Sequence, residues 1–130
     1  MVYLIRSEPT LTGEGMRLHA GGGAVLLPYE EIVWIYIRKR TGKGSYRYYG
    51  LTETDASVTG ELVVIDKRKD TYHLLEQGSR QKAGELFERI VEAGSSCFAG
   101  YAPDIRKLCE TEFEQMVTAC AAWRSIFGGG

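Results

Sequence analysis

The sequence predicts an α+β fold in which antiparallel strands come first and helices follow. Over the first ~75 residues, short apolar segments alternate with glycine-rich or charged turns, as expected of strands joined by hairpins. Over the last ~50 residues, apolar residues recur three and four positions apart, which is the spacing of an amphipathic helix. A group of strands followed by a group of helices is typical of α+β proteins.

Length and composition are those of one soluble domain. The chain has 130 residues, of which 44% are hydrophobic and 25% charged, and these values fit a globular domain with its own core. The net charge of −1 argues against nucleic acid as a partner, because nucleic-acid-binding domains carry a basic excess. No apolar run reaches the ~20 residues of a membrane span, and the first residues lack the pattern of a signal peptide. We expect a cytoplasmic protein, either complete or the soluble part of a protein at the cytoplasmic face of a membrane.

The first predicted strands are Val2–Ile5 and the two halves of the segment MRLHAGGGAVLLPY. Gly21, Gly22 and Gly23 supply the positive φ of a tight hairpin turn without steric cost. Pro28 then ends the second strand of this hairpin or lies at a sheet edge, because proline has no N–H for a sheet ladder.

The segment IVWIYIRKR is the clearest strand. Side chains alternate across a strand, and one face is aliphatic: Val33, Ile35 and Ile37. We assign this face to the core. Ile32, Trp34 and Tyr36 point the other way, and we expect Trp34 and Tyr36 to lie beneath a helix or opposite a neighbouring strand.

Further strands follow this segment. The glycine-rich stretch TGKGSYRYYG is predicted to be a loop that leads into a tyrosine-rich strand at about Tyr46–Thr52. The segments ELVVID and TYHLLE are two strands, and the charged turn KRKD joins them as a hairpin.

Two helices complete the predicted fold. The first spans about Arg80–Ala93, with Ser79 as its N-cap and Gly94 after its last turn. Its apolar stripe contains Ala83, Leu86, Phe87, Ile90 and Val91. The second spans about Asp104–Ile126, with Pro103 at its start, and would be roughly 35 Å long. Its apolar stripe contains Ile105, Leu108, Cys109, Phe113, Met116, Val117, Cys120 and Trp123.

The phrase LPYEEI, which joins a short hairpin to an alternating strand, resembles a motif of bacterial pleckstrin-homology-like (PH-like) domains. The later hairpin LVVIDKRKDTYHLL and the helix KAGELFERIVEA match the same pattern, so the resemblance covers about Met16–Ala93. The chain is similar in this respect to small Firmicutes proteins of unknown function. The resemblance implies a strongly bent antiparallel sheet or partial barrel that the first helix closes. It places the PH-like unit at residues 1–94 and a helical extension of the same domain at residues 95–130, and it implies no catalytic residue.

Arg38, Arg40, Lys43 and Arg47 form the candidate binding site. They fall within ten residues of one another, with no acidic residue among them. Such a patch can attract an anionic ligand or an anionic membrane surface. The alternative, which the sequence favours, is a solvated strand end and loop that neighbouring acids partly neutralise.

No catalytic, cofactor-binding or metal-binding signature is present in the sequence. His19 and His73 lie on predicted strands without a second ligand at short spacing. The three cysteines form no CxxC pair, which indicates free thiols in a reducing compartment. Cys109 and Cys120 lie on an apolar stripe, where a thiol is buried and inert, whereas Cys97 lies in a loop.

These features together predict a non-enzymatic binding or interaction module with no cofactor. Its expected partner is a protein or an anionic membrane surface. The alternative is a structural domain that forms homo-oligomers through the C-terminal helix, because that helix is longer than a small sheet needs for cover. A hydrolase that uses Cys97 as its nucleophile is a distant third hypothesis.

Overall fold

The computed structural model describes residues 1–5, 7–20, 23–40, 46–49, 59–74, 80–93 and 96–127 of the chain. The strands are β1 (Val2–Ile5), β2 (Thr10–Leu11), β3 (Gly15–Ala20), β4 (Gly23–Pro28), β5 (Ile32–Arg40), β6 (Tyr46–Tyr49), β7 (Thr59–Asp66), β8 (Thr71–Leu74) and β9 (Phe98–Ala99). The helices are α1 (Arg80–Glu92), α2 (Pro103–Thr111), α3 (Phe113–Phe127) and the short 3-10 helix η1 (Tyr29–Glu31). This content confirms the α+β class.

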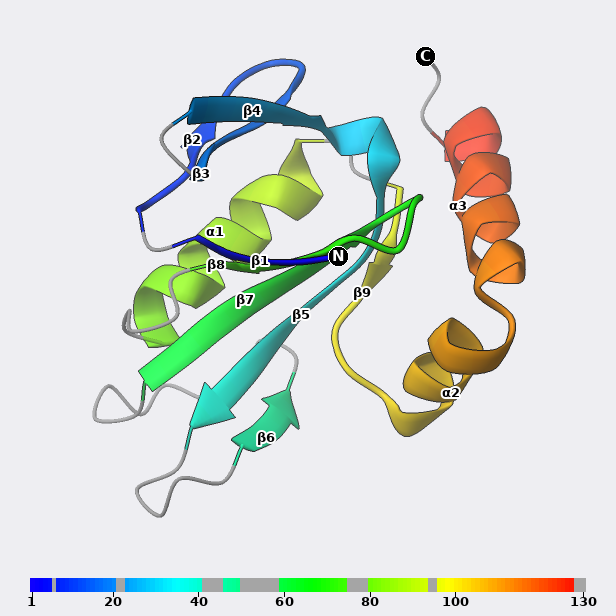
Figure 1. The fold of residues 1–130 in the computed structure, drawn as a ribbon. Helices are drawn as coiled ribbons and strands as arrows, with labels where there is room; N and C mark the ends of the chain where they lie inside the picture. The colour runs from blue at the N-terminus through cyan, green and yellow to red at the C-terminus, as the bar shows by residue number, and fades with distance from the viewer. Residues whose placement is uncertain are drawn as a thin grey trace.

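The larger sheet has the strand order β1-β8-β7-β5-β6, and β9 pairs with a different part of β5 from β6 (Figure 1). The pairs β5–β6, β5–β7 and β7–β8 are antiparallel, as predicted. However, β1 runs parallel to β8, with Val2 opposite Thr71, and β9 runs parallel to β5, with Trp34 opposite Phe98. The sheet is therefore mixed and not purely antiparallel, because two segments that are distant in sequence add strands that local hairpin patterns do not reveal.

A separate antiparallel sheet contains β2, β3 and β4. Ala20 pairs with Gly23, so β3 and β4 form the predicted hairpin, whose residues Gly21 and Gly22 lie outside the described part of the chain. β4 ends at Pro28, as predicted. Among the described strands, β1 and β6 end the larger sheet without meeting each other, so that sheet is not closed into a barrel. The PH-like architecture stays a prediction.

The second predicted hairpin consists of β7 and β8, and the segment Lys67–Asp70 joins them. Lys69 has a φ of 66°, which is the left-handed conformation that short turns often need. The tyrosine-rich strand is present as β6, and the remainder of its predicted range, residues 50–52, lies outside the described residues.

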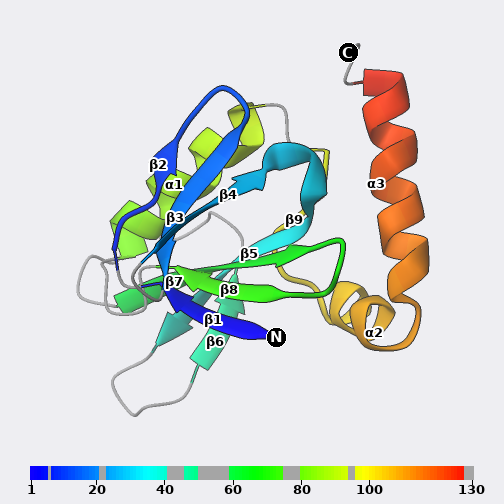
Figure 2. The same ribbon diagram turned by 45° about the horizontal axis from the view of Figure 1, so that its top comes forward.

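Two apolar cores lie on opposite faces of the larger sheet. The first core joins the sheet to α1 and to the smaller sheet. Its buried residues are Ile5, Met16, Leu18, Leu27, Tyr29, Ile32, Ile35, Ile37, Leu62, Val64, Tyr72, Leu74, Ala83, Leu86, Phe87 and Ile90. The second core joins the sheet to α2 and α3, and its buried residues are Val33, Trp34, Ile65, Cys109, Met116 and Cys120. Figure 2 shows α1 on one side of the larger sheet and α2 and α3 on the other.

A β-bulge determines which side chains of β5 enter which core. The register of β5 against β7 shifts between Ile32 and Trp34, which makes Val33 the extra residue. Ile32 therefore packs in the first core with Ile35 and Ile37, whereas Val33 packs beside Trp34 in the second. The predictions that Val33 shares a face with Ile35 and that Ile32 shares a face with Trp34 are both wrong, because a bulge changes the alternation without changing the hydrophobicity of the strand. The expected position of Trp34 beneath a helix is confirmed.

Helix α1 occupies nearly the predicted range. Four residues of its predicted stripe are buried: Ala83, Leu86, Phe87 and Ile90. Val91 is 39% exposed, contrary to the prediction, because it follows Ile90 directly and one residue turns a helix by about 100°. The predicted capping residues, Ser79 and Gly94, lie outside the described residues.

The single long C-terminal helix of the prediction is two helices. Glu112 separates them, with φ −141° and ψ 49°, which lie outside the helical region. The Glu112 N–H still donates to the Leu108 carbonyl at 2.7 Å, and the Gln115 N–H donates to the Glu112 carbonyl at 3.0 Å. The break allows both helices to follow one sheet, whereas a straight helix of roughly 35 Å would leave it. All residues of the predicted stripe belong to the second core or pack against it.

Candidate aromatic binding pocket

Three aromatic rings meet where β5 approaches the segment between β9 and α2. Trp34 and Tyr36 project from one face of β5, with ring centroids 4.4 Å apart. The Tyr101 ring lies 6.1 Å from the Trp34 ring and 5.7 Å from the Tyr36 ring. Trp34 is buried, whereas Tyr36 and Tyr101 are half-buried. The aromatic cluster therefore has a closed base and a partly open outer side.

Hydrogen bonds to the backbone after β9 fix the position of Tyr101. The Trp34 indole Nε1 donates to the Gly100 carbonyl at 2.8 Å. The Gly100 N–H donates to the Ile35 carbonyl, also at 2.8 Å. Gly100 has a φ of 92°, which glycine adopts without the steric cost of a Cβ atom. The indole therefore holds the turn that places Tyr101 over β5.

A cavity of ≈180 Å³ lies beside the three rings. Ile65 of β7 and three residues of α2, namely Arg106, Cys109 and Glu110, complete its wall. Arg106 Nε lies 3.0 Å from Glu110 Oε1, and Arg106 also forms a hydrogen bond with Tyr101. The contact with Tyr101 and then that with Glu110 raise the pKa of Arg106, so the guanidinium stays charged. The pocket therefore combines an aromatic base with a charged rim.

The sequence indicated only part of this pocket. Trp34 and Tyr36 stood out as an aromatic pair, but the sequence favoured complete cover by a helix or strand. Tyr101, Arg106 and Glu110 were not identified. The four-residue spacing of Arg106 and Glu110 is a visible helical signal, whereas no sequence pattern places Tyr101 beside β5, since the pairing of β9 with β5 brings it there.

Arg38, a residue of the predicted anionic-ligand site, is paired within the chain. Its guanidinium forms an ion pair with Glu61 of β7, whose side chain is 2% exposed. His73 Nδ1 lies 2.7 Å from the same Glu61 oxygen, Oε1. Arg38 therefore neutralises a buried carboxylate, and this role weakens its case as a ligand-binding cation.

Two other residues of the predicted site, Arg40 and Arg47, lie on neighbouring strands. Arg40 is opposite Tyr46, and Arg47 is opposite Lys39 in the antiparallel pairing of β5 with β6. Lys43 lies outside the described residues. The binding of an anionic ligand by Arg40, Lys43 and Arg47 stays a prediction.

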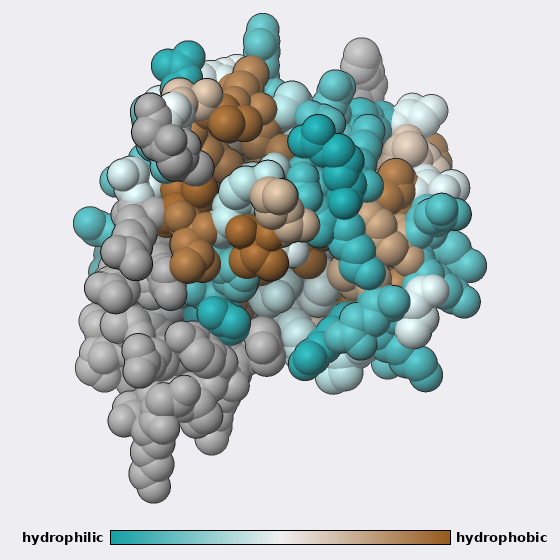
Figure 3. All heavy atoms as spheres, viewed as in Figure 1, coloured by the Kyte–Doolittle hydropathy of each residue, from teal (hydrophilic) through white to brown (hydrophobic). Residues whose placement is uncertain are grey.

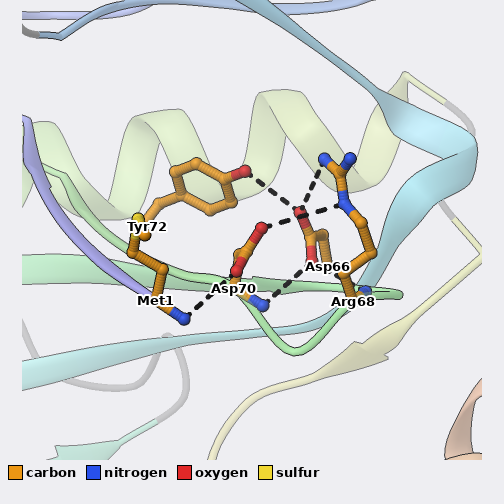
Figure 4. Close-up of polar contacts among 5 residues, drawn as sticks. All are labelled: Met1, Asp66, Arg68, Asp70 and Tyr72. Carbon is orange, nitrogen blue, oxygen red and sulfur yellow. Dashed lines mark hydrogen bonds and ion pairs between the residues drawn. The ribbon is translucent and has the colours of Figure 1, made fainter.

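Two buried carboxylates, Glu61 and Asp66, are not among the residues that the sequence singled out. Asp66 closes the β7–β8 hairpin, as Figure 4 shows: its Oδ1 accepts from the backbone N–H groups of Arg68 and Asp70 at 2.9 and 3.0 Å. Its Oδ2 accepts from the Tyr72 hydroxyl at 3.0 Å. Burial and this hydrogen bond raise the pKa of Tyr72. An aspartate directly before a short turn is a recognisable turn signal, and the role of Asp66 is structural.

Cys109 and Cys120 have little nucleophilic character near neutral pH. Burial raises the pKa of Cys109, and it raises the pKa of Cys120 to about 11. The Cys120 thiol also donates to the Val33 carbonyl at 3.5 Å. Burial of Cys109 and Cys120 is therefore confirmed, and both thiols are protonated near neutral pH. Cys97 is half-buried and packs against the first core, and its use as a nucleophile stays a prediction.

Neither histidine belongs to a group of side chains that could hold a metal ion in the described part of the chain. His19 is exposed on β3, and His73 contacts Glu61. Among the described residues, no group of three or more His, Cys, Asp or Glu side chains is arranged to hold a metal ion. Within the same residues, no helix is both long and apolar enough to cross a membrane.

Comparison with known protein families yields a match to the model of a domain of unknown function (DUF6709) over residues 16–109. The matched range begins in β3 and ends within α2. It includes Trp34 and Tyr101 and ends at Cys109, one residue before Glu110 of the pocket rim. No curated protein and no solved structure matches the chain.

Proposed function

We propose that the chain, which belongs to the DUF6709 family, is a non-enzymatic binding module that receives one ring-sized group of a partner in the pocket between β5 and α2. The observation that carries this proposal is the cavity of ≈180 Å³ beside Trp34, Tyr36 and Tyr101. A concave surface of apolar and aromatic side chains with a few polar groups at its edge is typical of ligand-binding sites.

The volume of the cavity limits the size of the group that it receives. The pocket is smaller than the ~300–1,000 Å³ of sites that enclose whole drug-sized ligands. An apolar cavity of ~150 Å³ is large enough to hold a benzene molecule. The pocket therefore suits a phenyl, phenol or indole ring that a protein or peptide partner presents, while the rest of the partner stays outside.

The walls of the pocket fit such a ring chemically. Tyr36 and Tyr101 are half-buried, so an entering ring can stack on them or meet them edge to face, and aromatic pairs contribute about 0.5–1.5 kcal/mol beyond their buried area. Arg106 and Glu110 are both largely exposed at the rim, and they offer donors and an acceptor to the peptide groups that flank the ring. The polar groups of the rim therefore orient the partner, and stacking on the aromatic rings provides affinity for it.

The groups around the pocket favour binding over catalysis. Arg106 and Glu110 pair with each other, and burial raises the pKa of the Cys109 thiol. A catalytic base or nucleophile would instead need a group whose pKa lies near the working pH and which reaches the reacting atoms. These observations support a module that recognises its partner without chemical conversion.

A protein is the better-supported class of partner. The ion pair of Arg38 with buried Glu61 reduces the cationic surface that an anionic membrane would contact. The apolar stripes of α2 and α3 pack on the chain's own sheet, which reduces the case for oligomerisation through these helices. A cytoplasmic location, at a membrane or away from it, belongs to the same proposal and does not depend on the pocket.

The proposal is tested by nuclear magnetic resonance, with the Trp34 indole N–H as the reporter. The probes are N-acetyl-phenylalaninamide and N-acetyl-tyrosinamide, with N-acetyl-glycinamide as the ring-free control. We expect saturable shifts of the Trp34 indole and of the Gly100 amide with both ring probes. The Kd should lie at about the millimolar level, because a single ring makes few contacts.

Tyr101→Ala is the matched variant, since it removes one half-buried wall of the pocket. It should weaken the binding of both ring probes about tenfold, whereas Val91→Ala, on the exposed side of α1, should leave it unchanged. The Trp34 and Gly100 resonances of the free variants show whether the turn after β9 has kept its structure. The proposal fails if N-acetyl-glycinamide shifts Trp34 as much as the ring probes do, or if Tyr101→Ala binds them with unchanged affinity.

A further inference from the structure

β4 is an edge strand that extends beyond the core. It pairs with β3 on one side, and no described strand pairs with its other side (Figure 1). Residues 23–26 are exposed, and burial begins only at Leu27. Val25 and Leu26 are 53% and 43% exposed, although they lie on opposite faces of the strand. Another strand can therefore approach the free edge of β4 without meeting the described core.

The backbone groups that point outward from this edge follow from the register. The Tyr29 N–H donates to the Glu14 carbonyl at 3.2 Å, which continues the β3–β4 pairing and makes Glu14 and Tyr29 a hydrogen-bonded pair. Hydrogen-bonded and non-bonded pairs alternate in an antiparallel ladder. The N–H and C=O groups of Ala24 and Leu26 therefore point away from β3, toward the free edge.

This edge lacks the usual protection against strand pairing. Natural edge strands often carry charged residues, bulges or prolines that prevent another strand from adding. The segment GAVLLP contains no charge, and its proline, Pro28, lies at the end of the strand. Figure 3 shows hydrophobic atoms gathered on the side of the molecule where β4 and β1 lie.

We propose that this edge pairs with the β4 edge of a second copy of the chain, antiparallel and across a two-fold axis. In the register centred on Val25, Ala24 of each copy exchanges both backbone hydrogen bonds with Leu26 of the other. If the pairing were centred on Leu26, Pro28 of one copy would face Ala24 of the other. Pro28 could then not donate a backbone hydrogen bond, because proline has no N–H. The sequence of β4 therefore selects the Val25-centred pairing.

The side chains of β4 are self-complementary in this arrangement. The two Val25 side chains meet at the axis on one face of the joined sheet, where both lose their exposure. On the other face, the small Ala24 of one copy lies opposite the larger Leu26 of the other, and such alternation of small and large residues permits close packing. No like charges meet along the strand, because GAVLLP has none. A second copy is therefore a better occupant than a segment of unrelated sequence.

Sedimentation measurements on the full chain, from about 1 µM to about 1 mM, test the proposal. We expect a reversible monomer–dimer equilibrium. Val25→Lys should raise the dimer Kd at least about tenfold, because it places two lysines side by side at the axis. Leu4→Lys on β1 and Ile126→Lys on α3 are matched controls at exposed apolar positions, and we expect the Kd of both to match the unmodified chain.

Amide hydrogen exchange locates the interface directly. Protection of the Ala24 and Leu26 amides should rise with protein concentration. The Leu27 amide, which faces Met16 of β3, should be protected at every concentration. The proposal is overturned if the chain is monomeric over the whole range. It is also overturned if Leu4→Lys or Ile126→Lys weakens the dimer while Val25→Lys does not.

Discussion

The two faces of the larger sheet are covered by cores of different chemical character. The first core is mainly aliphatic, and none of its buried members is more than 7% exposed. The second core is rich in sulfur and aromatic rings: Trp34, Cys109, Met116 and Cys120 are buried. The half-buried aromatic residues around it are Tyr36, Phe98, Tyr101, Phe113 and Trp123. The cavity beside Trp34, Tyr36 and Tyr101 borders the second core.

The two faces also differ in how closely their side chains fill the space. Branched aliphatic side chains from strands and α1 fill the first face closely. Flat rings on the second face meet at inclined angles, such as the 40° between Trp34 and Tyr36, and leave space beside them. Met116 and the cysteines adapt to such irregular surroundings because sulfur side chains are compact and polarizable. We infer that the first face determines the stability of the fold and that the second can change with less cost.

Truncation of one side chain in each core should show the largest difference between the two faces. Ile35→Ala empties a fully buried site of the first core, and we expect the free energy of unfolding to fall by about 3–4 kcal/mol. Met116→Ala should lower it by about 2–3 kcal/mol, since the half-buried rings nearby can move into the space. Urea unfolding followed by circular dichroism measures both values. Equal losses would mean that the second core is packed as rigidly as the first.

Two ion pairs outside the first core should differ in how much they contribute to the free energy of unfolding. Glu61→Gln leaves the largely buried Arg38 without its counter-ion, and we expect a loss of about 2–3 kcal/mol in unfolding free energy. Glu110→Gln should leave that free energy nearly unchanged, because the Arg106–Glu110 pair is exposed to solvent. The same urea experiment measures both variants. A small effect of Glu61→Gln would show that the Glu61 charge is not needed for the fold.

The third and smallest effect is a pH dependence that originates in the second core. Burial raises the pKa of Cys120 from 9.0 to about 11, so the folded state keeps this proton at a pH where the unfolded chain releases it. Stability from this source is complete below pH 9 and is lost as the pH rises toward 11. By pH 10 we expect a loss of about 1 kcal/mol. The loss is measured as the difference between the unfolding free energies at pH 8 and pH 10. The Cys120→Ser variant should show a clearly smaller difference. An unchanged loss in Cys120→Ser would place its origin elsewhere.

The sequence predicted much of this fold because local patterns determine much of it. The glycine hairpin before Pro28, the charged turn between β7 and β8, and both helical stripes are each visible within ~15 residues. The errors have non-local causes. The bulge at Val33 changes which way the side chains of β5 point without a change in residue type, and Glu112 is a good helix former that gives no local signal of a break. The parallel pairs of β1 with β8 and β9 with β5 join segments that are far apart in sequence.

Less of the pocket than of the fold could be predicted from the sequence. Trp34 and Tyr36 were visible as a pair, but Tyr101 reaches them only through the turn at Gly100. The basic cluster was visible by composition, yet the partner of Arg38 is Glu61, more than twenty residues later in the chain. A cluster of like charges in sequence does not reveal which of them the fold neutralises, because that depends on strand register.

The parallel pairing of β1 with β8 has a consequence for the order of folding. Val2 lies opposite Thr71, so β1 has to wait during synthesis for a partner that is made about seventy residues later. Contacts of such high sequence separation form slowly, because a long chain segment must close before they contribute. The β7–β8 hairpin, with its Asp66 turn, can form early and act as the template. We therefore expect β1 to dock last, and its transient absence would leave β8 as the exposed edge of a folding intermediate.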